Sequence, residues 1–190
     1  MGICVTERQE PFRVPFGNKN SEGTPEASFW DLKHHPEWIS VLPSSMGWPE
    51  TQALLQIVNS SSSPFLSLAA DQGFTTPTST APPVLTSFLT FCWFPVTHNT
   101  KPRIDQLAGF LVDNIDGVLQ QTSNQLQEPL PLEIVVEKQP TVFHLQDYSG
   151  WSLSVLMAGK GKTLKQARRI WGVGIQALQD VLGHPTFGSF

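Results

Sequence analysis

The feature that most constrains this chain is a long amphipathic stripe that begins just after Pro102. Hydrophobic residues recur there at intervals of three and four, at Ile104, Leu107, Ala108, Leu111, Ile115, Val118 and Leu119. This spacing places them along one face of an α-helix, and such a face must be buried against another layer of structure. We therefore predict a helix over residues 102–121 that packs on the core of a domain.

Weaker patterns predict two further helices. Pro49 suits a first helical position, and apolar residues at helical spacing follow it, so we expect a short helix over residues 49–59. Residues 163–182 carry a second long stripe, which Gly183 and Pro185 end.

Five segments have the composition of strands: residues 65–70, 84–96, 132–138, 141–146 and 151–158. A loop over residues 72–83 separates the first two strands. Turn-like links at Gln139-Pro140 and at residues 147–150 separate the last three strands, and these short links favour antiparallel pairing. The second strand is apolar at nearly every position from Phe88 to Phe94, which is typical of a central strand covered on both faces. The order of elements predicts an α+β fold, an antiparallel sheet of about five strands with the two long helices packed on one face and a short N-terminal helix.

The start of the chain differs from the rest in composition. Residues 1–28 are rich in Gly, Pro, Asn, Ser and Glu and show no sustained period of 2 or 3.6. Such a segment offers little apolar surface to offset the entropy of ordering, so we expect a mobile arm over residues 1–28 before a single domain of residues 29–190.

Composition also bears on location. The longest apolar run is the size of a strand and falls short of the roughly 20 residues of a membrane helix. Residues 1–10 lack the apolar core of a secretory signal. The two cysteines, Cys4 and Cys92, are too few for a disulfide framework, so a reducing, cytoplasmic location is expected.

The sharpest electrostatic feature is a basic cluster near the end of the chain. Every Lys and Arg after Lys138 lies within ten residues there, at Lys160, Lys162, Lys165, Arg168 and Arg169. The sequence Gly159-Lys160-Gly161-Lys162-Thr163 joins a predicted strand to a predicted helix, where backbone N–H groups and the helix dipole favour an anion. It lacks the first glycine of a nucleotide P-loop, because position 156 is Leu. We weigh a small-anion or phosphate site over residues 159–169 against a tight turn with Thr163 as the N-cap of the helix and solvated lysines.

A second candidate site lies at the N-terminus. Gly2 and Thr6 match the pattern M-G-x-x-x-[ST] for N-myristoylation, and Cys4 could carry the second acyl chain that stable membrane anchoring needs. Under this alternative the protein is a lipid-anchored effector or signalling protein, and its contact with a membrane depends on acylation of Gly2.

We identify no catalytic, metal or cofactor set in the sequence. His34 and Glu37 are too few for a metal site, and Cys92 lies in an apolar run where a thiol ionises poorly. The first hypothesis is therefore a non-enzymatic protein-interaction domain of adaptor, chaperone-like or regulatory kind. Its expected partner is a protein, with a homo-oligomer as one form, and nucleic acid is not favoured because the net charge is −4. The alternative is a small-anion or phosphate-binding domain, with enzyme activity left open, that uses residues 159–169.

Overall fold

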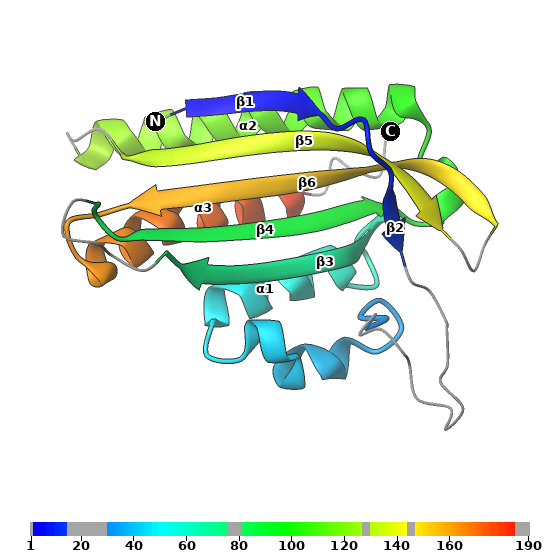
Figure 1. Cartoon of the computed structure of the whole chain (residues 1–190), viewed down its shortest axis with the longest axis horizontal. Helices are drawn as coiled ribbons and strands as arrows, with labels where there is room; N and C mark the ends of the chain where they lie inside the picture. The colour runs from blue at the N-terminus through cyan, green and yellow to red at the C-terminus, as the bar shows by residue number, and fades with distance from the viewer. Residues whose placement is uncertain (1, 15–29, 76–80, 127–129, 144–146, 185–190) are drawn as a thin grey trace.

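The computed structural model describes residues 2–14, 30–75, 81–126, 130–143 and 147–184. One sheet runs through the molecule in the strand order β1-β5-β6-β4-β3, and β2 pairs with β5 beyond the end of β1. The strands are β1 (Gly2–Glu7), β2 (Phe12–Val14), β3 (Phe65–Phe74), β4 (Val84–Trp93), β5 (Leu132–Phe143) and β6 (Tyr148–Lys160). Three α-helices lie behind this sheet in Figure 1: α1 (Pro49–Asn59), α2 (Lys101–Leu126) and α3 (Leu164–Leu182).

The three helices confirm the expectation from the sequence periods. α1 spans the residues predicted for it, with Pro49 at its start, and α3 begins one residue after its N-cap, Thr163, whose hydroxyl accepts a hydrogen bond from the Gln166 N–H at 3.2 Å. α2 continues to Leu126, beyond the predicted end at residue 121. Short 3₁₀ turns, η1 (Pro36–Val41), η2 (Pro43–Ser45) and η3 (Val96–His98), connect the larger elements. The α+β class is therefore confirmed.

The sheet differs from the predicted antiparallel sheet of about five strands, because it is mixed and has six. β3, β4, β6 and β5 pair in antiparallel fashion, whereas β1 and β2 both run parallel to β5. Both parallel strands come from the stretch where we expected a mobile arm: residues 2–7 and 12–14 lie in the sheet instead. Residues 15–28 of that stretch lie outside the described residues.

The strands predicted at residues 132–138 and 141–146 form one continuous strand, β5, which passes through Pro140 and ends at Phe143. Residues 144–146 lie outside the described residues. Successive residues of β5 direct their backbone N–H and C=O groups alternately toward β1 and toward β6. The Arg8 N–H donates to the Lys138 carbonyl at 2.9 Å, so the even-numbered residues of β5 bond toward the β1 side. Pro140 therefore directs its missing N–H toward the β1 side, where the pairing with β1 has ended at Glu7 and the pairing with β2 begins only at Phe12. A proline is tolerated in a strand where no partner needs the donor.

Two cores stabilise the fold, one on each face of the sheet. The large core lies between the sheet and the helices and includes the fully buried side chains of Trp171, Phe65 and Leu111. Leu111 lies on the stripe of α2 that predicted the helix. The second core is small, lies on the opposite face at one end of the sheet, and consists of Val14, Leu66, Leu68, Cys92, Val96 and Phe143. β2 supplies Val14 to it, so the second core covers only the end of that face.

No helix among the described residues is long and apolar enough to span a bilayer.

Candidate binding groove on the open sheet face

We call the side of the sheet that faces away from the three helices the open face. Because side chains alternate along a strand, residues paired across neighbouring strands share a face. Phe88 of β4 pairs with Leu156 of β6, and Leu156 pairs with Val135 of β5. Their sequence neighbours, such as Ser87 and Met157, face the helices, where the Trp171 indole N–H donates to the Ser87 hydroxyl at 2.7 Å. Phe88, Leu156 and Val135 therefore form an apolar row across the open face.

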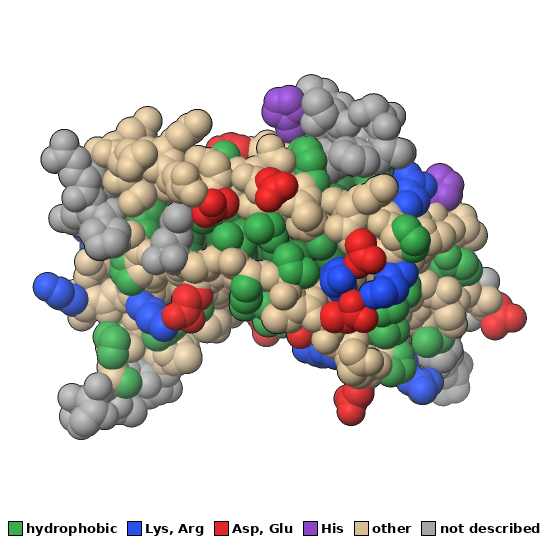
Figure 2. All heavy atoms as spheres, turned by 90° about the horizontal axis from the view of Figure 1, so that it is seen from above, with side chains coloured by type: hydrophobic (Ala, Val, Ile, Leu, Met, Phe, Trp, Pro, Cys, Tyr) green, Lys and Arg blue, Asp and Glu red, His purple; other side chains and the backbone are tan. Residues whose placement is uncertain are grey.

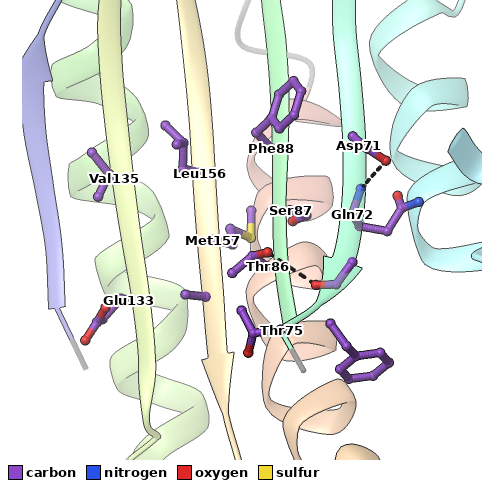
Figure 3. Close-up of a pocket in the computed structure, with 13 residues that line it drawn as sticks. Asp71, Gln72, Thr75, Thr86, Ser87, Phe88, Glu133, Val135, Leu156 and Met157 are labelled. Atoms are coloured by element: carbon purple, nitrogen blue, oxygen red, sulfur yellow. Dashed lines mark hydrogen bonds between the residues drawn. The ribbon is translucent and has the colours of Figure 1, made fainter. Parts of the chain in front are cut away.

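This row forms the floor of a groove of about 520 Å³. Figure 3 shows its residues on four adjacent strands, with Phe88 and Asp71 near one end and Thr75 near the other. Phe88 is 39% exposed on this face. Phe74 lines the edge of the groove but pairs with Leu85 and directs its ring toward Trp48 on the helix side. A large aromatic side chain with this much exposure on an uncovered face is typical of a binding surface.

The rim of the groove carries two carboxylates from opposite sides. Asp71 lies on β3, is exposed, and accepts a hydrogen bond from the Gln72 N–H at 2.8 Å. Glu133 lies on β5 and forms an ion pair of 2.5 Å with Lys160 of β6. Glu133 is thus paired with a cation, whereas Asp71 has no ion-pair partner among the described residues. The groove combines an apolar floor with an acidic rim at Asp71.

A network of buried polar side chains lies beyond one end of the groove, farther along the same strands. The Thr90 and Ser154 hydroxyls are 2.6 Å apart, and the Gln139 amide donates to the Ser154 hydroxyl at 3.1 Å. Ser152 continues the network, at 3.3 Å from the same amide and 2.7 Å from the Thr141 hydroxyl. These side chains satisfy one another, which buried polar groups require. The open face is therefore apolar only over the row of Phe88, Leu156 and Val135.

The second core lies beyond this network and holds Cys92. Burial in this apolar environment raises the pKa of the Cys92 thiol far above its usual range, and a hydrogen bond with Asn99 opposes that rise only weakly. The thiolate is the nucleophilic form, so Cys92 is inert at neutral pH. Its position is structural.

The basic turn predicted as an anion site lies at the end of β6 nearest the groove. Three of its backbone N–H groups already have partners: Lys160 donates to Pro131 O at 2.9 Å, Gly161 to Pro83 O at 3.1 Å, and Lys162 to the Gln166 side chain at 2.8 Å. Both glycines pack against α3. A Cβ on Gly159 would lie 2.6 Å from the backbone nitrogen of Trp171, and a Cβ on Gly161 would overlap the backbone of Ala167. The glycines thus allow β6 and α3 to approach closely.

The five cations of the cluster divide into two groups. Lys160 pairs with Glu133, and Arg168 pairs with Glu50 of α1 at 2.9 Å while its guanidinium lies over the Trp48 ring at 4.8 Å. Lys162, Lys165 and Arg169 are exposed and form no ion pair among the described residues. The anion hypothesis stays a prediction and now depends on these three side chains.

The two residues predicted for lipidation lie on β1. Gly2 and Cys4 are both exposed, and Cys4 pairs with Val135, which places its thiol in line with the apolar row of the groove. Acylation of either residue stays a prediction. Elsewhere, His34 pairs with Asp31 at 2.8 Å and His35 with Glu37 at 3.1 Å, so His34 and Glu37 do not form a common site. No three His, Cys, Asp or Glu residues gather into a metal site within the described part of the chain.

Sequence reasoning missed the groove, although a signal was present. β4 was expected to be covered on both faces, yet its first half leaves Thr86 and Phe88 exposed. The alternation of Thr86, Phe88 and Thr90 with Leu85 and Leu89 marks a half-exposed strand. The apolar run of its second half conceals this pattern, because Cys92 faces the second core while Phe91 and Trp93 face the large one.

Comparisons with protein-family models, with curated proteins and with solved structures found no match for this chain.

Proposed function

We propose that this protein is a non-enzymatic protein-interaction domain whose groove binds a peptide segment of a partner, with an apolar side chain next to a basic one. The observation that carries the proposal is the exposure of Phe88 on the uncovered sheet face. An apolar anchor in such a groove removes aromatic and aliphatic surface from water, which is the dominant gain in protein association.

The basic residue of the partner follows from the charge of the rim. The Asp71 carboxylate is exposed beside the apolar floor, and the whole chain has a net charge of −4. A Lys or Arg next to the apolar anchor would approach Asp71 and be drawn by the acidic surface, whereas an acidic segment would be repelled. Asp71 thus selects among partners, and Phe88 supplies affinity.

Selection from a displayed library of random linear peptides tests this proposal. We expect the selected peptides to be enriched in Leu, Phe or Ile next to Lys or Arg. Phe88→Ser should weaken their binding by about tenfold or more, since burial of a large apolar side chain is worth roughly 1.5–3 kcal/mol. Asp71→Asn should weaken it several-fold, and more strongly at low salt.

Val41→Ser is the matched control, because Val41 is an exposed apolar residue on η1, outside the groove. Equal binding of the selected peptides to wild type and to Phe88→Ser would overturn the proposal. So would a selection that yields acidic peptides.

A second candidate function is the binding of a small anion by the exposed face of α3. The exposure of Lys162, Lys165 and Arg169 without ion-pair partners among the described residues favours it. Titration with inorganic phosphate, ATP or a short RNA should then shift the amide resonances of residues 159–169, and Lys162→Ala with Lys165→Ala should abolish the shift while stability is kept. If no ligand moves these resonances at millimolar concentration, the small-anion function is excluded.

A further inference from the structure

The strand β1 forms a bare edge of the sheet. The two edges of the sheet are β1 and β3. Groups from outside the sheet bond to β3: the Asn59 side chain accepts from the Ser67 N–H at 3.1 Å, and the Ser44 carbonyl of η2 accepts from the Gln72 side-chain amide. β1 pairs only with β5 among the described residues, and its residues 2–6 contain no Pro, Lys or other charged residue. Exposed edges without such protection are templates for pairing with another strand.

The direction of the backbone groups on β1 follows from its pairing. Arg8 N–H donates to the Lys138 carbonyl of β5. Because successive residues of a strand bond to opposite sides, Gly2, Cys4 and Thr6 bond to β5 as Arg8 does. Ile3 and Val5 therefore direct their N–H and C=O groups outward. Val5 is also 44% exposed, which is unusual for a β-branched residue in a sheet.

We propose that β1 pairs with β1 of a second copy of this chain, antiparallel and about a two-fold axis at Cys4. Ile3 of one copy then lies opposite Val5 of the other, and each such pair exchanges two hydrogen bonds. The register places the two apolar side chains against each other and covers Val5. Cys4 of both copies meet at the axis as a non-hydrogen-bonded pair, with a Cα separation of about 4.5 Å.

Charge complementarity supports the second copy as the occupant of this edge. Figure 2 looks onto the β1 side of the molecule: hydrophobic side chains lie along its middle and a group of acidic and basic side chains lies toward one end. The two-fold axis brings Arg8 of one copy, which pairs with Glu137 of its own chain at 2.8 Å, diagonally toward Glu133 of the other copy, which pairs with Lys160 at 2.5 Å. Both side chains are half-exposed or more, at 50% and 61%, and Gly2 between them has no side chain. The dimer thus places an ion pair of one copy beside an ion pair of the other at each end of the uncharged strand pair, with Arg8 and Glu133 as the nearer members.

The dimer also has a consequence for the open face. The axis runs perpendicular to the sheet, so both open faces point to the same side and the rows that run from Cys4 to Phe88 meet at the centre. A dimer therefore presents two grooves side by side on one continuous sheet. The dimer itself does not depend on what the grooves bind.

Cross-linking of the full chain tests the register. Cys92 is buried, so Cys4 is the accessible thiol. Diamide, which accepts the two electrons and two protons of a thiol pair, should convert the wild type into a disulfide-linked dimer, and Cys4→Ser should abolish this product. In the Cys4→Ser background, Thr6→Cys is the matched control, because the proposed register separates the two copies of residue 6 by four residues, about 13 Å. Cross-linking of this control as efficiently as wild type, or no cross-linking at Cys4, would overturn the proposal.

Light scattering under reducing conditions tests the edge itself. The wild type should be a dimer, and Val5→Pro should raise its dissociation constant about tenfold or more, because proline removes an outward donor and leaves the bonds to β5 in place. Val5→Lys should act in the same way if Val5→Pro fails to fold. Phe88→Ser should remain dimeric, which separates this inference from the groove. A monomeric wild type, or a dimer that persists in both Val5 variants, would contradict the inference.

Discussion

At the scale of single residues, two glycines of this chain predict opposite effects of the same substitution. Gly159→Ala should destabilise the protein by about 1–3 kcal/mol, because the new Cβ would lie 2.6 Å from the backbone nitrogen of Trp171 and force β6 and α3 apart. Gly109→Ala should stabilise it by about 0.5–1 kcal/mol, because Gly109 is exposed within α2 and a Cβ there meets nothing within 4 Å. Urea denaturation of both variants measures the two effects. Equal and small changes would mean that the basic turn does not pack against α3.

At the scale of elements, the ion pair of Glu50 and Arg168 connects α1 to α3. Burial tends to raise the pKa of the Glu50 carboxyl, but hydrogen bonds from Arg168 and the charge of that residue outweigh burial, so the pKa lies below its usual value of about 4.5. A carboxyl with a lowered folded-state pKa stabilises the protein above its unfolded pKa, and this contribution is lost as the pH falls through the folded pKa.

At the scale of elements we therefore predict that wild type is more stable to unfolding than Glu50→Gln near neutral pH, and that this advantage is lost in acid. At pH 6 this advantage in the free energy of unfolding should be about 0.2–1 kcal/mol, since both side chains are about one-third exposed, and it should vanish as the pH falls well below 4.5. Chemical denaturation at several pH values tests this. An advantage that stays constant with pH would show that Glu50 acts through packing alone.

At the scale of the whole molecule, one sheet separates two hydrophobic cores, and both should unfold in one step. Leu111 belongs to the large core and Leu66 to the small one, and both are buried. We expect Leu111→Ala and Leu66→Ala each to lower the free energy of unfolding by about 2–5 kcal/mol within a single transition, because β3, β4 and β5 contribute to both cores. Separate transitions by tryptophan fluorescence and circular dichroism for Leu66→Ala would show that the small core unfolds independently.

The sequence by itself determined the elements whose signals are local. The stripes of α2 and α3 and the proline that starts α1 lie within a few residues of the helices they specify, and the turn at Thr163 contains its own cap. The strands β3, β4 and β6 also follow from their composition, within a few residues at their ends. Local spacing decides such elements because the side chains that share a face are close in the chain.

Only the tertiary structure decided the parallel strands and the groove. The apolar face of β1 consists of only two side chains, Ile3 and Val5, which is too short to predict a strand, and β1 becomes ordered by pairing with β5, far away in the sequence. The groove needs Phe88, Leu156 and Val135 side by side, and the register of three strands brings them together. Pairing between distant strands depends on which partners remain available after the helices have covered one face of the sheet, and no local period records that choice.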